Sequence, residues 1–232
     1  MKVGIIGGSN LRSTSLVKGA DKRSVTTPYG DVEAYYSDNR IFILRHGSDV
    51  SLPPHKINHL ANICALKEAK AVAVVGLCMV GGLKSRLRPP CLLVPDDYNS
   101  LWDVPTFYDD RVVHITPSLD ENLRKLIIAA AKNKELPVHT KGVYIQTHGP
   151  RLETRAEVRM LARFGDVVGM TMASEATLAQ ESEIPYAALC SVDNYAHGIA
   201  KSKPNFRAIL SDSERIGEMI AGIAVKAAGE WK

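Results

Sequence analysis

The residues best suited to chemistry lie in the third quarter of the chain, between Thr147 and Gly198. Glu153 follows a Gly-Pro-Arg-Leu turn, and Asn194 comes directly after Asp193 at the end of an apolar run. A carboxylate accepts hydrogen bonds, whereas an amide both donates and accepts them. If the fold brings Glu153 and Asn194 together, the pair can read the hydrogen-bonding edge of a purine. Each also has an ordinary explanation, because helix N-termini favour carboxylates and turns favour asparagine.

A second set of residues could hold an anion. Arg45 and His46 end a predicted strand, where arginine presents a planar fork to phosphate and histidine can donate beside it. Taken alone, the two also fit a surface arginine and a core histidine. The glycine-rich turn at residues 4–10 lets the backbone approach an anion, and Ser9 adds a hydroxyl. This turn fits a purely structural role equally well, and it does not complete the GxGxxG fingerprint of dinucleotide-binding proteins.

A sheet of mostly parallel strands would bring these distant residues together. Short apolar segments alternate with amphipathic ones, which predicts an α/β fold with a central mixed, mostly parallel sheet flanked by helices. Strands are predicted at residues 3–6, 32–36, 41–45, 72–75, 92–94, 143–146 and 187–192, and a further strand is predicted to end at Gly169. Asp193 and Asn194 would then leave the last strand at its carboxyl end, where such sheets bind their ligands.

Helix signals separate the predicted strands. One helix is expected at residues 55–69. Another is expected after Thr171 and contains Glu175, a carboxylate that fits either a solvated helix face or an internal ion pair. Three capping boxes predict further helix N-termini, at residues 118–121, 154–157 and 211–214. In the helix that follows residue 154, the apolar period turns Val158, Leu161 and Phe164 inward, and Gly165 marks the end.

Composition limits the class of protein. The 232 residues, of which 45% are hydrophobic and 23% charged, fit one domain spanning 1–232. The formal net charge of +4 is spread along the chain without a Lys/Arg block, which argues against nucleic-acid binding. No apolar run reaches the roughly 18 residues that span a bilayer, and we recognise no signal peptide. We therefore expect a cytoplasmic protein with no membrane partner, whose four cysteines are buried thiols.

Six segments of the chain, in this order, resemble the nucleoside phosphorylase family, which includes purine nucleoside phosphorylase and methylthioadenosine phosphorylase. They start at Gly4, Arg45, Gly81, Gly149, Gly169 and Asp193, so the resemblance covers nearly the whole chain. It implies a pentosyltransferase that converts a purine nucleoside and phosphate into a free purine and a pentose 1-phosphate. Phosphate is then a co-substrate, and neither a metal nor an organic cofactor is implied.

The resemblance implies a phosphate site. Its residues would be Ser9, Arg45, His46, Thr171 and, through its backbone N–H, Met79. The chain departs from the methylthioadenosine phosphorylase branch at two points, because Cys78 stands where that branch has a threonine and Val50 where it has a second histidine. A side-chain hydroxyl is lost at Cys78, whereas a backbone donor survives any change of side chain.

The resemblance also separates two kinds of purine. The 6-aminopurine branch carries a serine where this chain has Glu153, an aspartate where it has Asn194 and a second acid where it has Ala196, whereas the 6-oxopurine branch carries glutamate and asparagine. An ionised Glu153 accepts from the N1–H of a 6-oxopurine, and Asn194 donates to O6 or N7 of the leaving base. Against adenine, Glu153 would face a lone pair, and an unmatched buried polar group costs about 1–3 kcal/mol. We therefore expect a 6-oxopurine substrate, with Asp193 tuning or orienting the site.

The sugar and subunit contacts also follow from the resemblance. Leu152 would lie against the base and Met170 against the sugar, although a methionine here also fits core packing. Phe206 and Ile209 could line a 5′-methylthio pocket, or simply dock the last helix. Methylthioinosine therefore stands beside inosine and guanosine as a candidate substrate. A neighbouring subunit closes the site in such relatives, which implies a homotrimer or a dimer of trimers, and His114 lies in a segment that could reach across.

Three alternatives stay open on the sequence. A methylthioadenosine phosphorylase would have to tolerate Asn194 in its base site. A nucleosidase would use water, which the cysteine at position 78 allows but Arg45 and Thr171 oppose. A non-catalytic purine-binding protein would bind a nucleoside without cleaving it.

Overall fold

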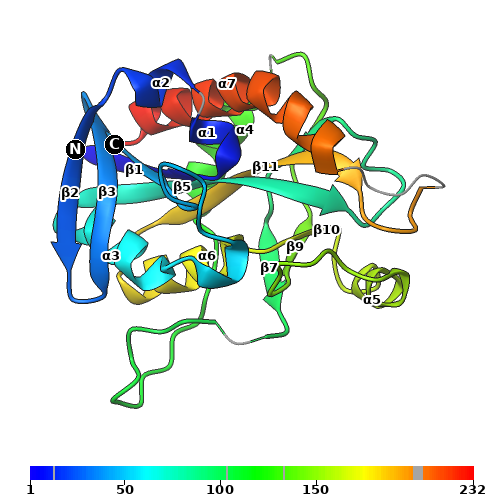
Figure 1. Cartoon of the computed structure of the whole chain (residues 1–232), viewed down its shortest axis with the longest axis horizontal. Helices are drawn as coiled ribbons and strands as arrows, with labels where there is room; N and C mark the ends of the chain where they lie inside the picture. The colour runs from blue at the N-terminus through cyan, green and yellow to red at the C-terminus, as the bar shows by residue number, and fades with distance from the viewer. Residues whose placement is uncertain (13, 103, 133, 201–205) are drawn as a thin grey trace.

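One mixed β-sheet forms the centre of the molecule, and helices cover both of its faces (Figure 1). The computed structural model describes residues 1–12, 14–102, 104–132, 134–200 and 206–232, without the side chains of Ser9 and of residues 206–215. Within these residues, six of the ten strand pairings are parallel. The predicted α/β fold with a mixed, mostly parallel sheet is therefore confirmed.

The strands of the described residues follow a branched order. The main path runs β2-β3-β4-β1-β5-β10-β9-β7, while β11 pairs with β5 and β6, and β6 also pairs with β8. The strands are β1 (Lys2–Gly7), β2 (Asp21–Thr27), β3 (Gly30–Ser37), β4 (Arg40–Leu44), β5 (Ala71–Gly82), β6 (Cys91–Leu93), β7 (Asp97–Ser100), β8 (Val138–His139), β9 (Val143–Gln146), β10 (Val167–Gly169) and β11 (Tyr186–Tyr195). The long strand β5 contacts β1, β10 and β11, and so joins the two halves of the sheet.

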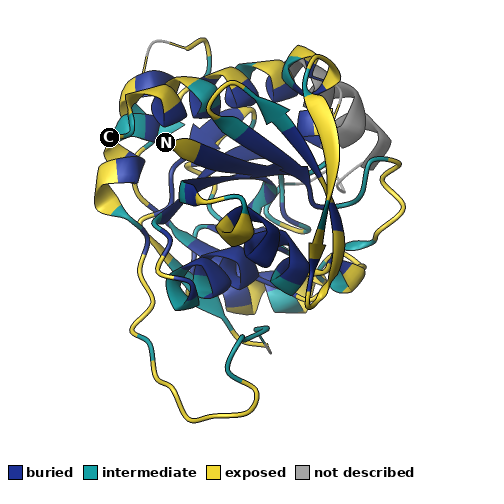
Figure 2. Ribbon diagram, turned by 90° about the vertical axis from the view of Figure 1, so that its left-hand side faces the viewer, coloured by how far each residue is buried: buried dark blue, intermediate teal, exposed yellow. Residues whose placement is uncertain are grey.

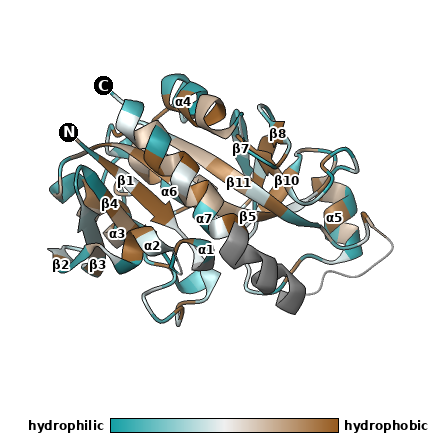
Figure 3. Ribbon diagram, turned by 90° about the horizontal axis from the view of Figure 1, so that it is seen from above, coloured by the Kyte–Doolittle hydropathy of each residue, from teal (hydrophilic) through white to brown (hydrophobic). Residues whose placement is uncertain are grey.

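The helices lie in two layers. They are α1 (Ser9–Arg12), α2 (Ser15–Lys18), the 3-10 turn η1 (Pro54–Lys56), α3 (His59–Glu68), α4 (Glu121–Ala131), α5 (Arg155–Leu161), α6 (Met172–Glu181) and α7 (Phe206–Glu230). Figure 1 shows α1, α4 and α7 above the sheet and α3 and α6 below it. Seen from above, α7 lies across the apolar strands β5 and β11 (Figure 3).

Alternation along the strands divides the core between the two faces. In β5, Val75 and Leu77 pack with the residues of α4 and α7, whereas Val74 and Cys78 pack with those of α3 and α6. This is the period of two that a strand imposes on its side chains. Figure 2 shows that the central strands are buried, whereas the segment between β7 and α4 extends from the body and is largely exposed.

Most predicted strands are confirmed. The observed β1, β3, β4, β5, β6, β9 and β11 contain or nearly match the predicted segments, and β10 ends at Gly169 as predicted. Asp38 in the turn between β3 and β4 has a positive φ of 49°. Strands β2, β7 and β8 were not predicted. In β2 most side chains are exposed, and the other two strands are only four and two residues long, so none has a clear apolar pattern.

The helix boundaries were predicted less well. Thr154 does form a capping box with Glu157, but α5 ends at Leu161. Phe164 therefore lies beyond the helix and is 56% exposed, so its predicted inward position was wrong. The N-cap of α4 is Asp120, whose side chain accepts from the backbone N–H of Leu123, rather than a residue at 118. Helical periodicity predicts burial only while the helix continues.

Two more elements start earlier or later than expected. The first helix predicted at residue 55 begins at His59, after the short turn η1, because the Asn58 side chain caps it by accepting from Ala61. The last helix begins at Phe206, ahead of the capping box predicted at residues 211–214. Within the described residues, no helix is both long enough and apolar enough to cross a membrane.

Candidate active site

A cavity of about 460 Å³ opens at the carboxyl ends of the sheet strands. Its walls come from residues after β1, β4, β9 and β10 and from the last residues of β5 and β11. The lining residues are Gly8, Arg45, His46, Val50, Leu52, Pro53, Pro54, Met79, Val80, Gly81, Leu152, Glu153, Val168, Gly169, Met170, Thr171, Asp193, Asn194, Ala196 and His197. An open α/β sheet is expected to bind its ligand at this edge.

The cavity unites most of the residues singled out in the sequence. It is lined by Arg45, His46, Met79, Leu152, Glu153, Met170, Thr171, Asp193 and Asn194. His114 is exposed in the segment before α4 and does not line the cavity of its own chain. The side chains of Ser9, Phe206 and Ile209 lie outside the described residues, so their proposed contacts stay predictions.

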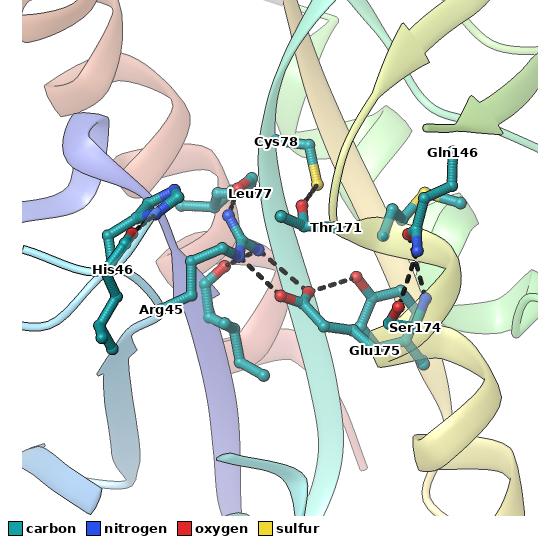
Figure 4. Close-up of polar contacts among 12 residues, drawn as sticks. Arg45, His46, Leu77, Cys78, Gln146, Thr171, Ser174 and Glu175 are labelled. Atoms are coloured by element: carbon teal, nitrogen blue, oxygen red, sulfur yellow. Dashed lines mark hydrogen bonds and ion pairs between the residues drawn. The ribbon is translucent and has the colours of Figure 1, made fainter. Parts of the chain in front are cut away.

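Arg45 does not extend freely into the cavity. Its Nε donates to Glu175 Oε1 at 2.6 Å and its Nη2 to Glu175 Oε2 at 3.0 Å (Figure 4). Two further N–H groups donate to the carbonyl oxygens of Leu77 and Ile6, at 2.6 and 3.2 Å. These contacts use four of the five N–H groups of a guanidinium. Arg45 is thus held mainly by the protein, with one N–H on Nη1 left over.

Glu175 was assigned no site role from the sequence, and its alternative explanation as part of an internal ion pair is the one the structure shows. It is fully buried in α6, and the hydroxyl of Tyr186 also donates to its Oε2 at 2.9 Å. Burial by itself lowers the pKa of Arg45, but the Glu175 carboxylate outweighs burial and the pKa is raised. Arg45 therefore stays charged, and the Glu175 carboxylate balances this charge in the absence of any bound anion.

His46 faces the same end of the cavity. Its Nδ1 lies 2.8 Å from the carbonyl oxygen of Leu52, and because a carbonyl only accepts, Nδ1 carries the proton. In a neutral ring the other nitrogen, Nε2, is then an acceptor, and it lies on the side of Gly8 together with Nη1 of Arg45. Burial lowers the pKa of His46, which favours this neutral form. A neutral His46 therefore offers Nε2 as a hydrogen-bond acceptor, whereas the sequence analysis expected a donor at this residue.

Thr171 is the N-cap residue of α6, yet its side chain does not cap the helix. The hydroxyl of Tyr144 on β9 accepts from the backbone N–H groups of Thr171 and Met172, at 3.1 and 3.3 Å. Gln146 on the same strand accepts from the N–H of Ser174 and donates to its hydroxyl. Since side chains of β9 satisfy the first turn of α6, the Thr171 hydroxyl is left to face the cavity.

The Tyr144 hydroxyl also explains a glycine. A Cβ at Gly169 would collide with this hydroxyl, so the Gly-Met-Thr segment has room for Tyr144 only with glycine at its first position. Cys78 lies behind Thr171, with its Sγ 4.0 Å from the Thr171 Oγ1, and is buried. Cys78 does not line the cavity, whereas its neighbour Met79 does.

Glu153 also lines the cavity, and its side chain is oriented by Thr147. The Thr147 hydroxyl donates to Glu153 Oε1 at 2.7 Å, which leaves Oε2 to another donor. Glu153 is carried by the turn after β9, where Gly149 has a φ of 69° and packs on the sulfur of Met170. A side chain at Gly149 would be strained by that φ and would collide with Met170.

Asn194 reaches the cavity because β11 is irregular there. Val192 pairs with Val80 and Asn194 with Gly81, so Asp193 is an extra residue in its strand. Successive residues of a regular strand point to opposite faces, but a bulge breaks this alternation. Both Asp193 and Asn194 therefore line the cavity, within β11 rather than beyond its end as predicted.

Hydrogen bonds fix the two polar side chains of the bulge. Asn194 Nδ2 donates to the carbonyl oxygen of Tyr195 at 2.8 Å, which sets the amide orientation and leaves one N–H and the Oδ1. Ser191 donates to Asp193 Oδ2 at 3.1 Å. The residue near them that lines the cavity is the apolar Ala196, so no second acid accompanies Asn194 at that position.

Part of the cavity lining was not predicted. Leu52, Pro53 and Pro54 form an apolar wall beside His46, together with Val50, which the sequence analysis named only as a departure from the family. The proline pair after an Arg-His-Gly turn is the signal that points to this wall. His197 also lines the cavity, and its Nε2 accepts from Arg155 Nε at 3.3 Å. Its position three residues after Asn194 is the only signal for it in the sequence.

The cysteines and the other side chains that could bind a metal ion do not gather into a site within the described residues. All four cysteines are buried and unpaired, as the sequence analysis expected. Within the described part of the chain, no group of three or more His, Cys, Asp or Glu side chains is arranged to hold a metal ion. The polar side chains that line the cavity, among them Arg45, Glu153 and Asn194, can donate and accept hydrogen bonds.

The chain is similar in sequence to known phosphorylases. A sequence model described as the phosphorylase superfamily matches residues 2–228. A probable 6-oxopurine nucleoside phosphorylase of Archaeoglobus fulgidus is 42% identical over 217 residues, covering 91% of this chain and 89% of that protein. A probable S-methyl-5′-thioinosine phosphorylase of Methanocaldococcus jannaschii is 38% identical, covering 94% of this chain and 86% of that protein.

The fold comparison agrees. The solved structure of a methylthioadenosine phosphorylase from Schistosoma mansoni in complex with adenine superposes with a TM-score of 0.91 at 25% identity. The match covers 99% of this chain and 91% of that one. Nearly the whole chain therefore shares the architecture of that protein.

Proposed function

The chain belongs to the phosphorylase superfamily, and we propose that it is a purine nucleoside phosphorylase that cleaves 6-oxopurine nucleosides. One observation carries this proposal: Glu153 and Asn194 line the same cavity as Arg45, His46 and Thr171. The same cavity thus contains residues suited to the polar edge of a purine and residues suited to an anion. Phosphorolysis needs a site for each of them, because the phosphate must attack the sugar while the base is held.

The base site favours a 6-oxopurine. Thr147 occupies Oε1 of Glu153, so Oε2 is the atom that accepts from the N1–H of the base. Asn194 is oriented by the carbonyl of Tyr195, and its remaining N–H donates to O6 or N7. Leu152, half exposed on the cavity wall, covers one face of the ring. A 6-aminopurine would present a lone pair to Glu153, and the unmatched contact costs about 1–3 kcal/mol.

Phosphate binds at the opposite end. The Thr171 hydroxyl and the remaining N–H of Arg45 donate to it, Nε2 of neutral His46 accepts from its O–H group, and the backbone N–H of Met79 and the hydroxyl of Ser9 are expected to complete the site. Met170, between the two ends, lies against the sugar. The reaction uses phosphate as co-substrate and no metal or organic cofactor.

The chemistry is a displacement at the anomeric carbon. An oxygen of phosphate forms a bond to this carbon, the bond from the carbon to N9 of the purine breaks, and its electron pair passes to the base. The transition state has positive charge on the sugar and growing negative charge on the purine. Asn194 stabilises the purine by donating a hydrogen bond as the charge develops, and the phosphate stabilises the sugar. Asp193, held by Ser191, keeps the strand bulge and hence Asn194 in place.

At the 5′ position of the sugar, the substrate carries either a hydroxyl or a methylthio group. The apolar wall of Val50, Leu52, Pro53 and Pro54 offers no charged group, and relatives carry names with and without a methylthio group. Inosine, guanosine and 5′-methylthioinosine are therefore the substrates we propose, with Phe206 and Ile209 as residues to vary.

The segment between β7 and α4 favours an oligomer. It is anchored where Thr106 and the N–H of Phe107 donate to the Glu181 carboxylate at 2.7 Å, but beyond that anchor Val112 is 87% exposed. We propose that a second copy of the chain covers this segment and that His114 approaches the neighbour's cavity, in a homotrimer or a dimer of trimers. Light scattering coupled to size-exclusion chromatography tests this, because a monomeric mass of 25.3 kDa would contradict it.

A methylthioadenosine phosphorylase is the second candidate. It is favoured by relatives of that name, such as one of Thermofilum pendens that is 33% identical over 96% of this chain. Asn194 and Ala196 oppose it, because they supply no acid to accept from a 6-amino group.

Release of free base from inosine, guanosine, 5′-methylthioinosine and 5′-methylthioadenosine, with and without phosphate, separates these functions. We expect phosphate-dependent cleavage of the 6-oxopurine nucleosides. Cleavage of 5′-methylthioadenosine alone would overturn the 6-oxopurine assignment. Cleavage without phosphate would identify a nucleosidase, and binding without cleavage would identify a purine-binding protein.

A further inference from the structure

Thr147 is placed where it can control the base site without touching the base. It is the first residue after β9 and is 7% exposed, and it does not line the cavity. Its backbone N–H donates to the carbonyl oxygen of Gly169 at 2.8 Å, which continues the pairing of β9 with β10 by one residue. The position of its side chain is therefore set by the sheet.

The Thr147 hydroxyl has two acceptors within reach and one proton. Glu153 Oε1 lies at 2.7 Å and the carbonyl oxygen of Gly169 at 3.4 Å. The shorter contact, to an oxygen that can carry charge, is the stronger hydrogen bond. The proton is thus directed to Glu153, whose Oε1 is the acceptor of this hydrogen bond.

The neighbouring cation does not take over this task. Arg151, two residues before Glu153, is turned towards α5, where its Nη1 and Nη2 donate to the two carboxylate oxygens of Glu157 at 2.8 and 2.7 Å. Among the described residues, Thr147 provides the one hydrogen bond that orients Glu153. The carboxylate plane of Glu153 therefore depends on a single hydroxyl.

We propose that Thr147 is a positioning residue that holds the Glu153 carboxylate in the orientation that recognises 6-oxopurines. The inference rests on the proposed function and names the residue that gives it base specificity. With Oε1 held, Oε2 points along one direction into the cavity and accepts the N1–H of the base. Without the hydroxyl, the carboxylate can rotate about its terminal bond. Substrate binding must then order the carboxylate, and this entropy cost reduces the free energy gained from the hydrogen bond to N1–H.

Thr147→Val tests the proposal, because valine keeps the branched shape and the backbone hydrogen bond but lacks the hydroxyl. The matched control is Thr177→Val. Thr177 lies on α6 and does not line the cavity, and its hydroxyl forms a hydrogen bond of 3.0 Å with Tyr98 Oη. We expect Thr147→Val to lower kcat/KM for inosine roughly tenfold or more, the loss typical of one hydrogen bond to a charged group. The KM for phosphate should change less than twofold.

Conservative variants separate positioning from a general structural effect. Thr147→Ser keeps the hydroxyl and should retain most of the wild-type kcat/KM for inosine. Thr147→Cys, with a weaker donor in a side chain of similar size, should fall between serine and valine, and it replaces valine in the comparison if Thr147→Val does not fold. Binding of hypoxanthine by calorimetry should weaken in the same order, whereas the much weaker binding of adenine should not.

The outcomes distinguish this inference from the function on which it rests. If the wild-type protein does not cleave inosine, guanosine or 5′-methylthioinosine in the presence of phosphate, the proposed function fails. If it does, but Thr147→Val behaves as Thr177→Val does, the positioning role is wrong and the function stands. An equal rise of KM for inosine and phosphate, or a Thr147→Ser variant as impaired as Thr147→Val, would likewise overturn the positioning role.

Discussion

Arg45 and Glu175, 130 residues apart in the sequence, form a two-point ion pair that is buried behind the cavity. Arg45 carries the fork geometry that suits phosphate, but Glu175 accepts from two of its nitrogen atoms. The anion end of the cavity is therefore built around a matched charge rather than a free cation. In the proposed phosphate site, the other contacts are therefore assigned to hydroxyl and backbone groups and to His46.

Replacing Glu175 with glutamine should destabilise the protein. Glu175→Gln leaves the Arg45 charge buried without its counter-charge, and breaking a buried pair in this way costs about 3–5 kcal/mol. We expect a lower free energy of unfolding in urea. Phosphate should raise the melting temperature of the variant more than that of the wild type, because the anion then supplies the missing charge.

Tyr186→Phe is the control for this prediction. It removes only the hydroxyl that donates to Glu175 Oε2 at 2.9 Å, so the loss of stability should be about 1–2 kcal/mol. A Glu175→Gln variant no less stable than Tyr186→Phe would show that the Arg45 charge is compensated by another group.

Removing the Tyr144 hydroxyl should weaken phosphate binding. Tyr144→Phe leaves the N–H groups of Thr171 and Met172 without their acceptor, so the N-terminus of α6 shifts and the Thr171 hydroxyl is displaced. We expect a rise of roughly tenfold in the KM for phosphate, the effect of losing about one hydrogen bond to an anion. The KM for the nucleoside should change little.

Tyr98→Phe serves as the comparison for Tyr144→Phe. It removes a hydroxyl that also contacts α6, at Thr177, but outside the cavity. Equal phosphate KM values for the two variants would refute the capping role of Tyr144 in the site.

Asn194→Asp should reduce the preference for 6-oxopurines. A carboxylate cannot donate to O6 or N7, so kcat/KM for inosine should fall by about 10- to 100-fold. The ratio of activity on inosine to activity on adenosine should fall with it. The new carboxylate also faces the carbonyl oxygen of Tyr195, to which Nδ2 now donates, so a complete exchange of specificity is not expected.

Steady-state kinetics on both nucleosides check this prediction. The same chemical change on the exposed surface, Asn39→Asp, should leave both values unchanged. An Asn194→Asp variant with an unaltered inosine to adenosine ratio would mean that Asn194 does not contact the base.

Acid should destabilise the fold through His59. The pKa of His59 is lowered from its ordinary 6.5 to about 4, chiefly by burial; Glu175 opposes this shift, whereas Arg45 and His46 contribute to it. Between these two values the unfolded chain binds a proton that the folded chain does not, so stability is complete above pH 6.5 and falls as the pH drops towards 4. The full effect is on the order of 3 kcal/mol.

Urea unfolding at fixed protein concentration between pH 7 and about pH 4 measures this effect. In His59→Phe the part of the slope due to His59 should disappear, whereas the exposed His114→Phe should keep it. An identical pH slope in the wild type and in His59→Phe would show that His59 titrates alike in both states.

The fold could be predicted from the sequence where the signal is local. Apolar segments such as residues 3–6 and 143–146 form largely buried strands, because burial removes their apolar side chains from water. Thr154 caps α5 because its partner Glu157 is only three residues away. Phe164 was placed wrongly because the pattern does not reveal where α5 ends. The polar strand β2 was missed because pairing with β3, rather than burial, holds it in the sheet.

The site was predicted as a set of residue types. Glu153, Asn194, Arg45 and Thr171 were identified by their chemistry and by a family resemblance, and all four line the cavity. Their partners were not identified, because Thr147, Tyr144 and Glu175 have no distinctive neighbours in the sequence. Each is defined by a hydrogen bond or ion pair that exists only after the strands are assembled.

The chemical groups of the site, and the segments that carry them to the carboxyl edge of a sheet, can be read from neighbouring residues, because strand periodicity, turns and caps are local properties. How those groups are used depends on contacts between distant segments. The bulge at Asp193 turns two successive residues into the cavity, and Glu175 takes most of the hydrogen-bonding capacity of Arg45. Both depend on the register and packing of elements more than a hundred residues apart, which no local pattern encodes.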